Sequence, residues 1–436
     1  MRAGFNLLAA GIAFSVLLLQ PVRADAAKES VLYSFCSQQK CTDGAYPTSE
    51  LVNANGILYG TTPEGGTPRC SGGCGTVFSL DPKTGVFTTL YSFCRQADCA
   101  DGADPMSSIE YSAGKLYGTT IDGGSGHCPS GCGTLYAIDP ATGSEKIVYA
   151  FQGGSDGANP YAQPIVVSGK LYGTTAAGGE SHVGTIFSLD RKTGTETVLY
   201  SFRYDGEDGN TPESPLTYLG QTFYGTTYDG GGSEAGTLFS FEPVSGVEKV
   251  LHAFNGDDGA LPDRLSHAYG ELYGTTAQGG DHEAGTVFTF VPKHGPETIL
   301  YSFCAVGDRA NRHSRNCADG YEPSGKLRNL EGVIYGTTVG GGEITCASGK
   351  GNCGTGFPPK IAGVSHCHER NIYHGCGTVF SVDPSTGAET VLYSFGSQPG
   401  DGLFPYGGLV SVNGTFYGTT RAGGANGKGT VFAVTP

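Results

Sequence analysis

The chain has 436 residues, with 26 lysines and arginines against 41 aspartates and glutamates, 73 glycines and 14 cysteines. Glycine without a Gly-X-Y period excludes collagen, and 38% apolar residues are too many for a disordered polymer. The formal net charge of −15 argues against nucleic acid or an anionic membrane surface as partner, because both require clustered lysine and arginine.

Residues 1–26 have the pattern of an export signal. Arg2 precedes an apolar run from Leu7 to Leu19, and the small-residue site Ala24-Asp25-Ala26 follows. The run is too short to span a bilayer and no second apolar stretch occurs, so we expect cleavage after Ala26 and no membrane span. The sequence therefore predicts a secreted or periplasmic protein, in which cysteines form disulfides.

Four motifs then recur seven times in a fixed order. Asp-Gly-x-x-Pro is followed by Tyr-Gly-Thr-Thr, by Gly-Thr-(Val/Leu/Ile)-(Phe/Tyr) and by a segment similar to Val-Leu-Tyr-Ser-Phe. The first motif begins at Asp43, Asp101, Asp156, Asp208, Asp258, Asp319 and Asp401. Since β-branched and aromatic residues alternate with turn residues, each repeat of about 50 residues predicts four short strands, named a, b, c and d in chain order.

The connections support antiparallel pairing within each repeat. Asn55-Gly56 suits a two-residue hairpin between a and b, and Asp81-Pro82-Lys83-Thr84-Gly85 joins c to d. No stretch after residue 26 keeps a 3.6-residue apolar period, so we expect almost no helix. The sequence predicts an all-β fold, a seven-bladed β-propeller of four-stranded antiparallel blades. A parallel β-solenoid is the alternative, although its coils are usually shorter.

The two ends of the repeat array predict how the ring closes. The array opens with a single d strand at 31–35 and ends with strands a, b and c of the last repeat, the last of them at 429–436. Pairing of these two segments would complete the last blade and leave no open edge. Residues 27–436 are therefore expected to form one domain, with a long insertion at 339–376 in blade 6.

In tandem, Asp-Gly-x-x-Pro, Leu-Tyr-Gly-Thr-Thr, Gly-Thr-Val-Phe and Asp-Pro-x-Thr-Gly resemble the bacterial GloVer-type repeat proteins, sometimes labelled choice-of-anchor proteins. The resemblance covers essentially the whole chain after residue 26. It implies an extracytoplasmic, propeller-like protein, and it implies no reaction and no catalytic residues.

Loop lengths differ between the two faces of the predicted ring. The b-to-c loops have 12, 12, 8, 8, 8, 38 and 8 residues and the d-to-a connections 7, 7, 4, 5, 3, 15 and 5, whereas the other turns barely vary. Because strands alternate in direction, all this variation lies on one face, the loop-bearing face. Rigid scaffolds carry function on such loops, so we expect this face to bind a glycan or an extracellular protein. Neutral drift of solvated loops is the alternative.

All fourteen cysteines lie in the lengthened loops, and each of these loops holds an even number. We expect pairing within loops: Cys36 with Cys41, Cys70 with Cys74, Cys94 with Cys99, Cys128 with Cys132, Cys304 with Cys317, Cys346 with Cys353, and Cys367 with Cys376. Pairing across loops of one blade stays open. Zinc is the alternative, but the Cys-x-x-Cys pairs of structural zinc sites do not occur, so we expect neither metal nor cofactor.

Two groups of titratable residues are candidates for binding. The motif aspartates near the channel mouth, among them Asp43, Asp101, Asp319 and Asp401, could hold a cation or sugar hydroxyls, or accept hydrogen bonds from their own turns. The blade 6 insertion contains His366, His368, Glu369 and His374, which could bind a metal or transfer protons, or belong to a solvated loop clasped by a disulfide.

These observations favour a non-catalytic protein that binds a glycan or protein through the loop-bearing face. The alternatives are an extracellular polysaccharide hydrolase or lyase, with Asp or Glu near the channel and a His or Tyr from blade 6, and a structural spacer. Fold alone does not choose between them. Two carboxylates about 5 to 9.5 Å apart in a cleft, one with a raised pKa, would favour the hydrolase.

Overall fold

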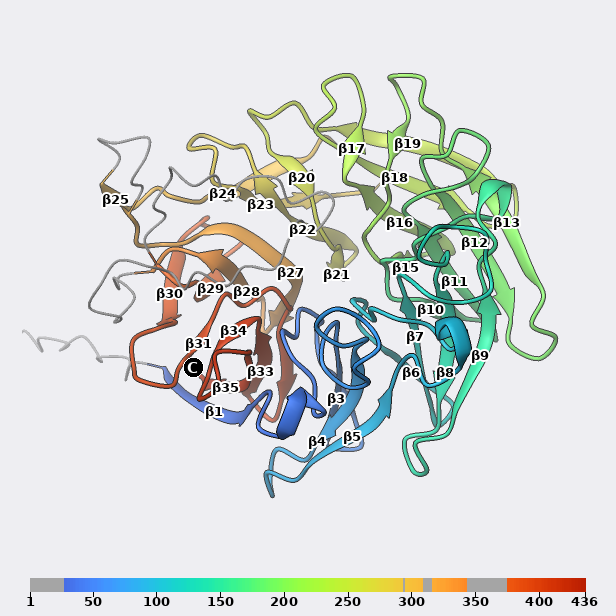
Figure 1. Ribbon diagram of the computed structural model, residues 1–436. Helices are drawn as coiled ribbons and strands as arrows, with labels where there is room; N and C mark the ends of the chain where they lie inside the picture. The colour runs from blue at the N-terminus through green and yellow to red at the C-terminus, as the bar shows by residue number, and fades with distance from the viewer. Residues whose placement is uncertain (1–26, 293–294, 309–315, 343–374) are drawn as a thin grey trace, which may run out of the picture.

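The structure, a computed structural model, describes residues 27–292, 295–308, 316–342 and 375–436. Seven four-stranded antiparallel sheets surround a central axis (Figure 1), which confirms the predicted seven-bladed β-propeller. These ranges contain no α-helix, only three 3-10 turns at Gln39–Cys41, Ala97–Cys99 and Gly154–Asp156. No helix in the described part of the chain has the length and hydrophobicity that a membrane span needs. The predicted signal, 1–26, lies outside the described residues.

Each blade takes its four strands in the predicted order a, b, c, d. Blade 1 comprises β2 (Val52–Ala54), β3 (Ile57–Thr62), β4 (Thr76–Leu80) and β5 (Phe87–Ser92). Blade 2 comprises β6 (Glu110–Ser112), β7 (Lys115–Thr120), β8 (Thr134–Ile138) and β9 (Glu145–Ala150). Blade 3 comprises β10 (Ile165–Val167), β11 (Lys170–Thr175), β12 (Thr185–Asp190) and β13 (Glu196–Ser201). Blade 4 comprises β15 (Thr217–Leu219), β16 (Thr222–Thr227), β18 (Thr237–Glu242) and β19 (Val247–Ala253).

The remaining blades follow the same plan. Blade 5 comprises β21 (Ser266–Ala268), β22 (Glu271–Gln278), β23 (Thr286–Phe290) and β24 (Thr298–Ser302). Blade 6 comprises β27 (Tyr321–Leu330), β28 (Val333–Gly340), β29 (Thr378–Val382) and β30 (Glu389–Ser394). Blade 7 comprises β32 (Val410–Val412), β33 (Thr415–Thr420), β35 (Thr430–Thr435) and β1 (Lys28–Ser34). Short additional strands are β14 (Gly209–Asn210), β17 (Asp229–Gly230), β20 (Ala260–Pro262), β25 (Gly307–Asp308), β26 (Asn316–Cys317), β31 (Gly402–Leu403) and β34 (Ala422–Gly423).

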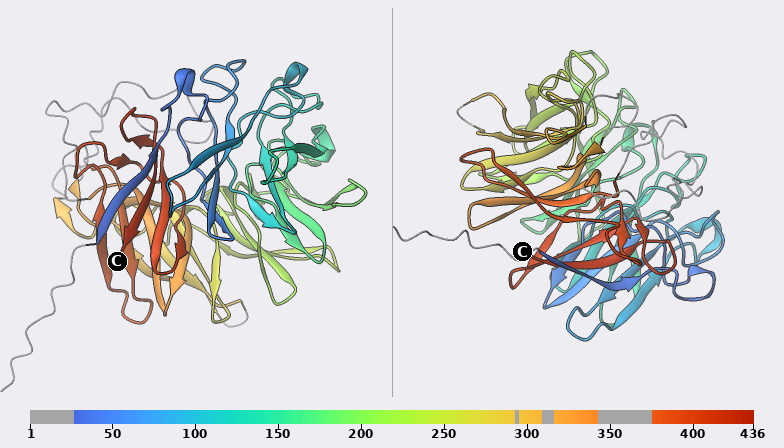
Figure 2. Two further views of the ribbon diagram at one scale, coloured as in Figure 1. Left: turned by 90° about the horizontal axis from the view of Figure 1, so that it is seen from below. Right: turned by 90° about the vertical axis from the view of Figure 1, so that its left-hand side faces the viewer.

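The ring closes where the beginning of the described chain meets its end. Strand β1 pairs antiparallel with β35, from Lys28 opposite Thr435 to Ser34 opposite Thr430 (Figure 1). This pairing is the one predicted from the ends of the repeat array. Seen from the side, the 3-10 turns of the d-to-a connections lie at one face of the ring and the c-to-d turns at the other (Figure 2, left).

The core consists of aromatic layers between neighbouring blades. The phenylalanine that ends each d segment packs against the c-strand aromatic ring of the next blade, as Phe35 does against Phe78 with ring centroids 5.1 Å apart. The same pair recurs at the other six seams, with centroids 4.9 to 5.4 Å apart. The glycine of Tyr-Gly-Thr-Thr makes room for that ring, because a Cβ on Gly60 would lie 2.6 Å from Phe78.

The two threonines of Tyr-Gly-Thr-Thr have separate tasks. The second bonds the buried threonine of Gly-Thr in its own blade, as Thr62 does with Thr76 at 2.8 Å, and this bond recurs in all seven blades. In six blades the first reaches the next blade, as Thr61 does when its hydroxyl donates to the Ser107 carbonyl at 2.9 Å. The hydroxyl of Thr275 in blade 5 has no partner among the described residues. Since buried hydroxyls are usually paired, these bonds explain the two threonines by the fold rather than by a ligand.

The glycine of Gly-Thr and the proline of Asp-Gly-x-x-Pro form one interlock between blades. Gly236 has a φ of +94°, and a Cβ there would lie 2.5 Å from Pro262 of the next blade and 2.5 Å from the Thr227 carbonyl. Gly246, in a c-to-d turn, has a φ of +71° but nothing within 4 Å of the same position.

We therefore expect Gly236→Ala to destabilise the protein much more than Gly246→Ala. The control costs about 1–2 kcal/mol for left-handed backbone, and Gly236→Ala adds about 1–3 kcal/mol of overpacking at the seam. Urea denaturation of the two variants measures the difference. Equal unfolding free energies would contradict the interlock.

Candidate functional site

The motif aspartates lie at the seams between blades, where they accept hydrogen bonds. Asp101 accepts from the Tyr91 hydroxyl at 2.8 Å and from the backbone N–H groups of Arg95 and Gln96. The other three candidates, Asp43, Asp319 and Asp401, accept equivalent bonds from Tyr33, Tyr301 and Tyr393. All four are buried. The four aspartates therefore accept hydrogen bonds from their own turns, which is one of the two roles considered above. That they bind a ligand stays a prediction.

A glutamate from the d strand of the following blade faces six of these seven aspartates. Burial, assisted by the neighbouring aspartate, raises the pKa of these glutamates to about 7 or about 8. They are Glu29, Glu145, Glu196, Glu248, Glu297 and Glu389. At the seventh seam Phe87 takes the place of the glutamate and stacks on Tyr33, with ring centroids 3.7 Å apart. We refer to each set of d-strand tyrosine or histidine, aspartate and glutamate as a seam triad.

Beyond each aspartate the chain forms a short ladder with the residues that follow Tyr-Gly-Thr-Thr. This ladder is β14 with β17 in blade 4, β31 with β34 in blade 7, and single bridges such as Ala103 with Asp122 in blade 2. The residue before each motif proline then adopts a left-handed conformation, and its N–H bonds the previous blade, as Asp104 does with the Cys74 carbonyl at 3.0 Å. Left-handed non-glycine residues cost energy and often occur at functional sites.

These ladders hold four variable positions at the channel mouth, which we call the mouth positions. They are the third and fifth residues after the motif aspartate and the fourth and fifth after the motif tyrosine, for example Asp104, Met106, Ile121 and Asp122 in blade 2. The backbone is alike in every blade while the side chain changes. Side chains of different chemical types therefore lie at equivalent positions around the channel mouth.

A cavity of about 790 Å³ opens at this mouth on the loop-bearing face. It is lined mainly by mouth positions of blades 1 to 4, together with one cation from blade 7. Its polar and aromatic lining includes Glu64, Asp104, Asp122, Glu213, Asp229, Tyr46, Tyr161, Tyr228, Asn159 and Arg421. None of the four candidate aspartates at the seams is among its lining residues.

Two carboxyl groups in the cavity are poised to exchange protons near neutral pH. Burial raises the pKa of Asp104 to about 7, with the charges of Asp122 and Glu64 adding to the effect and Arg421 opposing it. Burial likewise raises the pKa of Glu213 to about 7, assisted by Asp229. Each group can therefore donate or accept a hydrogen bond, as an alternating set of ligand hydroxyls requires.

Charged side chains cross the channel further along the inner strands. Arg264 of blade 5 donates to the Ser108 hydroxyl of blade 2 at 2.6 Å, and Arg328 of blade 6 pairs with Glu50 of blade 1. Burial lowers the pKa of Lys326, which lies in the same cluster. These contacts join blades that are not neighbours in the ring.

Five disulfides form within single loops, as expected: Cys36–Cys41, Cys70–Cys74, Cys94–Cys99, Cys128–Cys132 and Cys304–Cys317. Cys376 is also disulfide-bonded, while Cys346, Cys353 and Cys367 lie outside the described residues. The predicted cluster of His366, His368, Glu369 and His374 lies outside them too.

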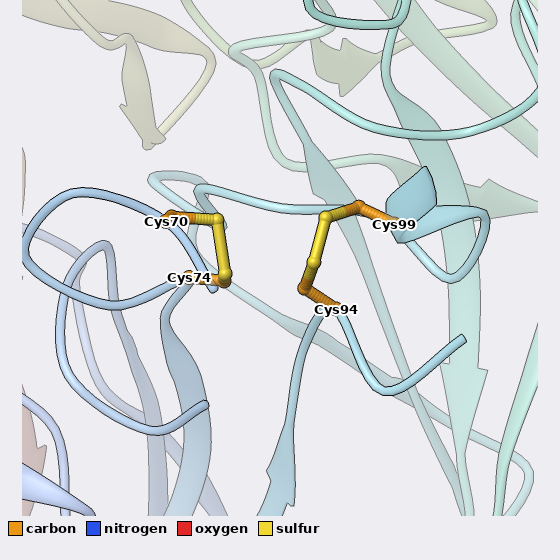
Figure 3. Close-up of side chains that lie close together, drawn as sticks. All are labelled: Cys70, Cys74, Cys94 and Cys99. Atoms are coloured by element: carbon orange, nitrogen blue, oxygen red, sulfur yellow. A yellow bond between two sulfur atoms is a disulfide. The ribbon is translucent and has the colours of Figure 1, made fainter. Parts of the chain in front are cut away.

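One disulfide belongs to the cavity wall. Cys70 and Cys74 line the cavity, and the Cys94–Cys99 bridge lies beside them (Figure 3), with the four sulfur atoms within 4.8 Å of one another. A wall fixed by short covalent loops loses little entropy when a ligand binds. In blade 1, a loop closed by a predicted disulfide therefore forms part of the cavity wall.

Apart from Cys70 and Cys74, the lining residues of the cavity were not predicted from the sequence, although they lie on the loop-bearing face. Most of them occupy the residues directly before and after the proline of Asp-Gly-x-x-Pro and the two residues after Tyr-Gly-Thr-Thr. Aligning the seven repeats against each other would have revealed them, because acidic and aromatic residues concentrate there in repeats 1 to 4.

None of the curated proteins matches the chain in sequence. Among solved structures, an oligogalacturonate lyase in complex with manganese is 11% identical, over 94% of this chain and 96% of that chain, with a TM-score of 0.48. A chain from a nidogen/laminin complex is 12% identical, over 73% of this chain and 89% of that chain, with a TM-score of 0.40. Likenesses this distant carry no argument about function.

The repeat family described as the Gloeobacter/Verrucomicrobia repeat matches residues 20–165 and 112–357. These two overlapping matches span most of the chain and include six of the seven copies of Tyr-Gly-Thr-Thr completely within them. The protein therefore belongs to the Gloeobacter/Verrucomicrobia repeat family, in agreement with the resemblance of its motifs.

Proposed function

We propose that the protein is an exported binding protein that takes a neutral or amino-bearing glycan into the cavity at the channel mouth. The observation that carries this proposal is the convergence of carboxyl, amide and tyrosine side chains from four neighbouring blades on one cavity. Sugars are bound by such groups, since hydroxyls need paired donors and acceptors and sugar rings need aromatic faces. The five disulfides and the repeat family support export.

The charge of the cavity narrows the class of glycan. Glu64, Asp122 and Asp229 concentrate acidic groups in the cavity of a chain whose formal net charge is already −15. Arg421 is the only lysine or arginine among its lining residues. A polyanionic polysaccharide would be repelled, whereas a neutral chain or an amino sugar would not.

A glycan array and calorimetric titration of residues 27–436 test the proposal. We expect Asp104→Asn and Tyr161→Phe each to weaken binding of an array ligand by about tenfold, the effect of about 1.4 kcal/mol from one lost or altered hydrogen bond. Asp281→Asn is the matched control, because Asp281 is exposed on the same face and does not line the cavity. Binding that all three variants retain unchanged would refute the cavity as the site.

A glycoside hydrolase is the second candidate, and the raised pKa of Asp104 beside Asp122 favours it. Hydrolysis requires one protonated carboxyl as acid and one ionised carboxylate as base or nucleophile. Release of reducing ends from an oligosaccharide that binds, abolished in Asp104→Asn, would identify this activity. Tight binding of the oligosaccharide without hydrolysis would contradict the hydrolase and support binding as the function.

A further inference from the structure

The seam at Asp258 differs from the other six seams in the residue that pairs with the motif aspartate. Six blades present a tyrosine, namely Tyr33, Tyr91, Tyr149, Tyr200, Tyr301 and Tyr393, whose hydroxyl donates to the motif aspartate. Blade 4 presents His252 at the same position of its d strand. An imidazole nitrogen is a common metal ligand, whereas a phenol with a raised pKa keeps its proton.

His252 brings three ligand groups together at the seam between blades 4 and 5. His252 Nε2 lies 3.0 Å from Asp258 Oδ2, and one ligand atom from each of His252, Asp258 and Glu297 lies within 4.8 Å of the other two. Glu297 Oε1 is buried and has no hydrogen-bond partner among the described residues. The side chains of His252 and Asp258 are 20% and 18% exposed, so solvent reaches the group.

We propose that His252, Asp258 and Glu297 bind a divalent transition-metal ion, with Zn²⁺ as the ion their donor set suits best. Zinc takes histidine nitrogen and carboxylate oxygen at about 2.0–2.2 Å, often with three protein ligands and one water. The three groups need only small side-chain movements to reach such distances from a common centre. Calcium fits less well, because it takes six to eight oxygen ligands.

The metal would connect two blades. His252 belongs to β19 of blade 4, Asp258 to the following connection, and Glu297 immediately precedes β24 of blade 5. An ion bound by all three would link these elements and stabilise the folded ring in proportion to its concentration. The Glu297 carboxyl would then be ionised, and its unpartnered oxygen would have a partner.

Calorimetric titration of residues 27–436 with Zn²⁺ tests this proposal, with His252→Tyr as the decisive variant. Tyrosine occupies the position at six seams, so this variant should fold, which its melting temperature without metal verifies. We expect it to bind one Zn²⁺ fewer than the unmodified protein. Zinc held elsewhere on the chain cancels in this difference. Zn²⁺ should also raise the melting temperature of the unmodified protein more than that of the variant.

A second variant keeps the test open if His252→Tyr fails to fold. Glu297→Gln removes one ligand with little change of shape, and we expect it to weaken this Zn²⁺ equivalent at least about tenfold. Glu248→Gln is its matched control, because Glu248 faces Tyr200 and Asp208 at a seam without histidine. Equal stoichiometry and affinity in the unmodified protein and in the folded variants would overturn the proposal, as would Ca²⁺ binding there as tightly as Zn²⁺.

Discussion

Deletion of residues 27–35 is expected to abolish cooperative unfolding of the ring. The deletion removes β1, leaves β35 with an open edge, and takes the buried Phe35 from the layer between blades 7 and 1. Loss of a buried phenylalanine side chain alone costs about 3–5 kcal/mol, and an open edge adds a site for aggregation. Thermal melting followed by circular dichroism, together with size-exclusion chromatography, measures the result.

A peptide of residues 27–35 provides the control for this deletion. Added in excess, it should pair with β35 and restore a cooperative transition whose midpoint rises with peptide concentration. The same peptide carrying Phe35→Ala should restore it far less. A truncated protein that melts like the full ring would show that strand pairing at the joint contributes little.

Raising the pH from 5.5 to 9 is expected to lower the melting temperature of the protein. The six seam glutamates have pKa values of about 7 or about 8 in the folded protein, above their ordinary value of 4.5. Between these values the folded protein holds protons that the unfolded chain has released. Their stabilisation is complete below pH 4.5 and is lost as the pH rises through 8. Each glutamate contributes at most about 1.4 kcal/mol per pH unit in that window.

Glutamine variants test this linkage, since glutamine resembles a glutamate that keeps its proton. Replacing Glu145, Glu196 and Glu248 together by Gln should remove roughly a third of the decrease, because three of the eight carboxyl groups with pKa values of about 7 or about 8, the six seam glutamates with Asp104 and Glu213, no longer titrate. Glu207→Gln is the control, since Glu207 is exposed. Calorimetric melting at pH 5.5, 7 and 9 gives the slopes. The same slope in the triple variant and the unmodified protein would show that these glutamates do not govern the pH dependence.

The fold could be predicted because the residues that pack each blade against the next recur in every repeat. The glycine of Tyr-Gly-Thr-Thr accommodates an aromatic ring, the second threonine bonds the threonine of Gly-Thr in every blade, and the glycine of Gly-Thr packs against the proline of the next blade. Asn55 and Gly56 have φ values of 56° and 83°, as a two-residue hairpin of the predicted kind requires. Local propensity and global topology therefore agree in every blade.

The site could be predicted only as a face of the ring. The cavity depends on a left-handed residue before each motif proline, and residues at such positions are usually extended, so the sequence does not indicate where their side chains point. The seam glutamates could not be predicted because they precede the apolar d segments. The predicted segment 31–35 starts at Val31, whereas β1 begins at Lys28 and includes Glu29. His252 occupies the tyrosine position of the Val-Leu-Tyr-Ser-Phe segment, and the repeat pattern alone does not show that it meets two carboxyl groups.

Phe87 gives the circle one seam with a different response to alkali. Tyr33, in the strand that closes blade 7, stacks on Phe87 of blade 1, where the other six seams each contain an acidic group from the following blade. High pH can therefore weaken six boundaries by ionising a partly buried glutamate at each of them. The boundary between blades 7 and 1 has no such glutamate, because Phe87 occupies its position. At the boundary where the ring closes, stacked rings stand in place of a glutamate, so opening of the ring at high pH should begin at another seam.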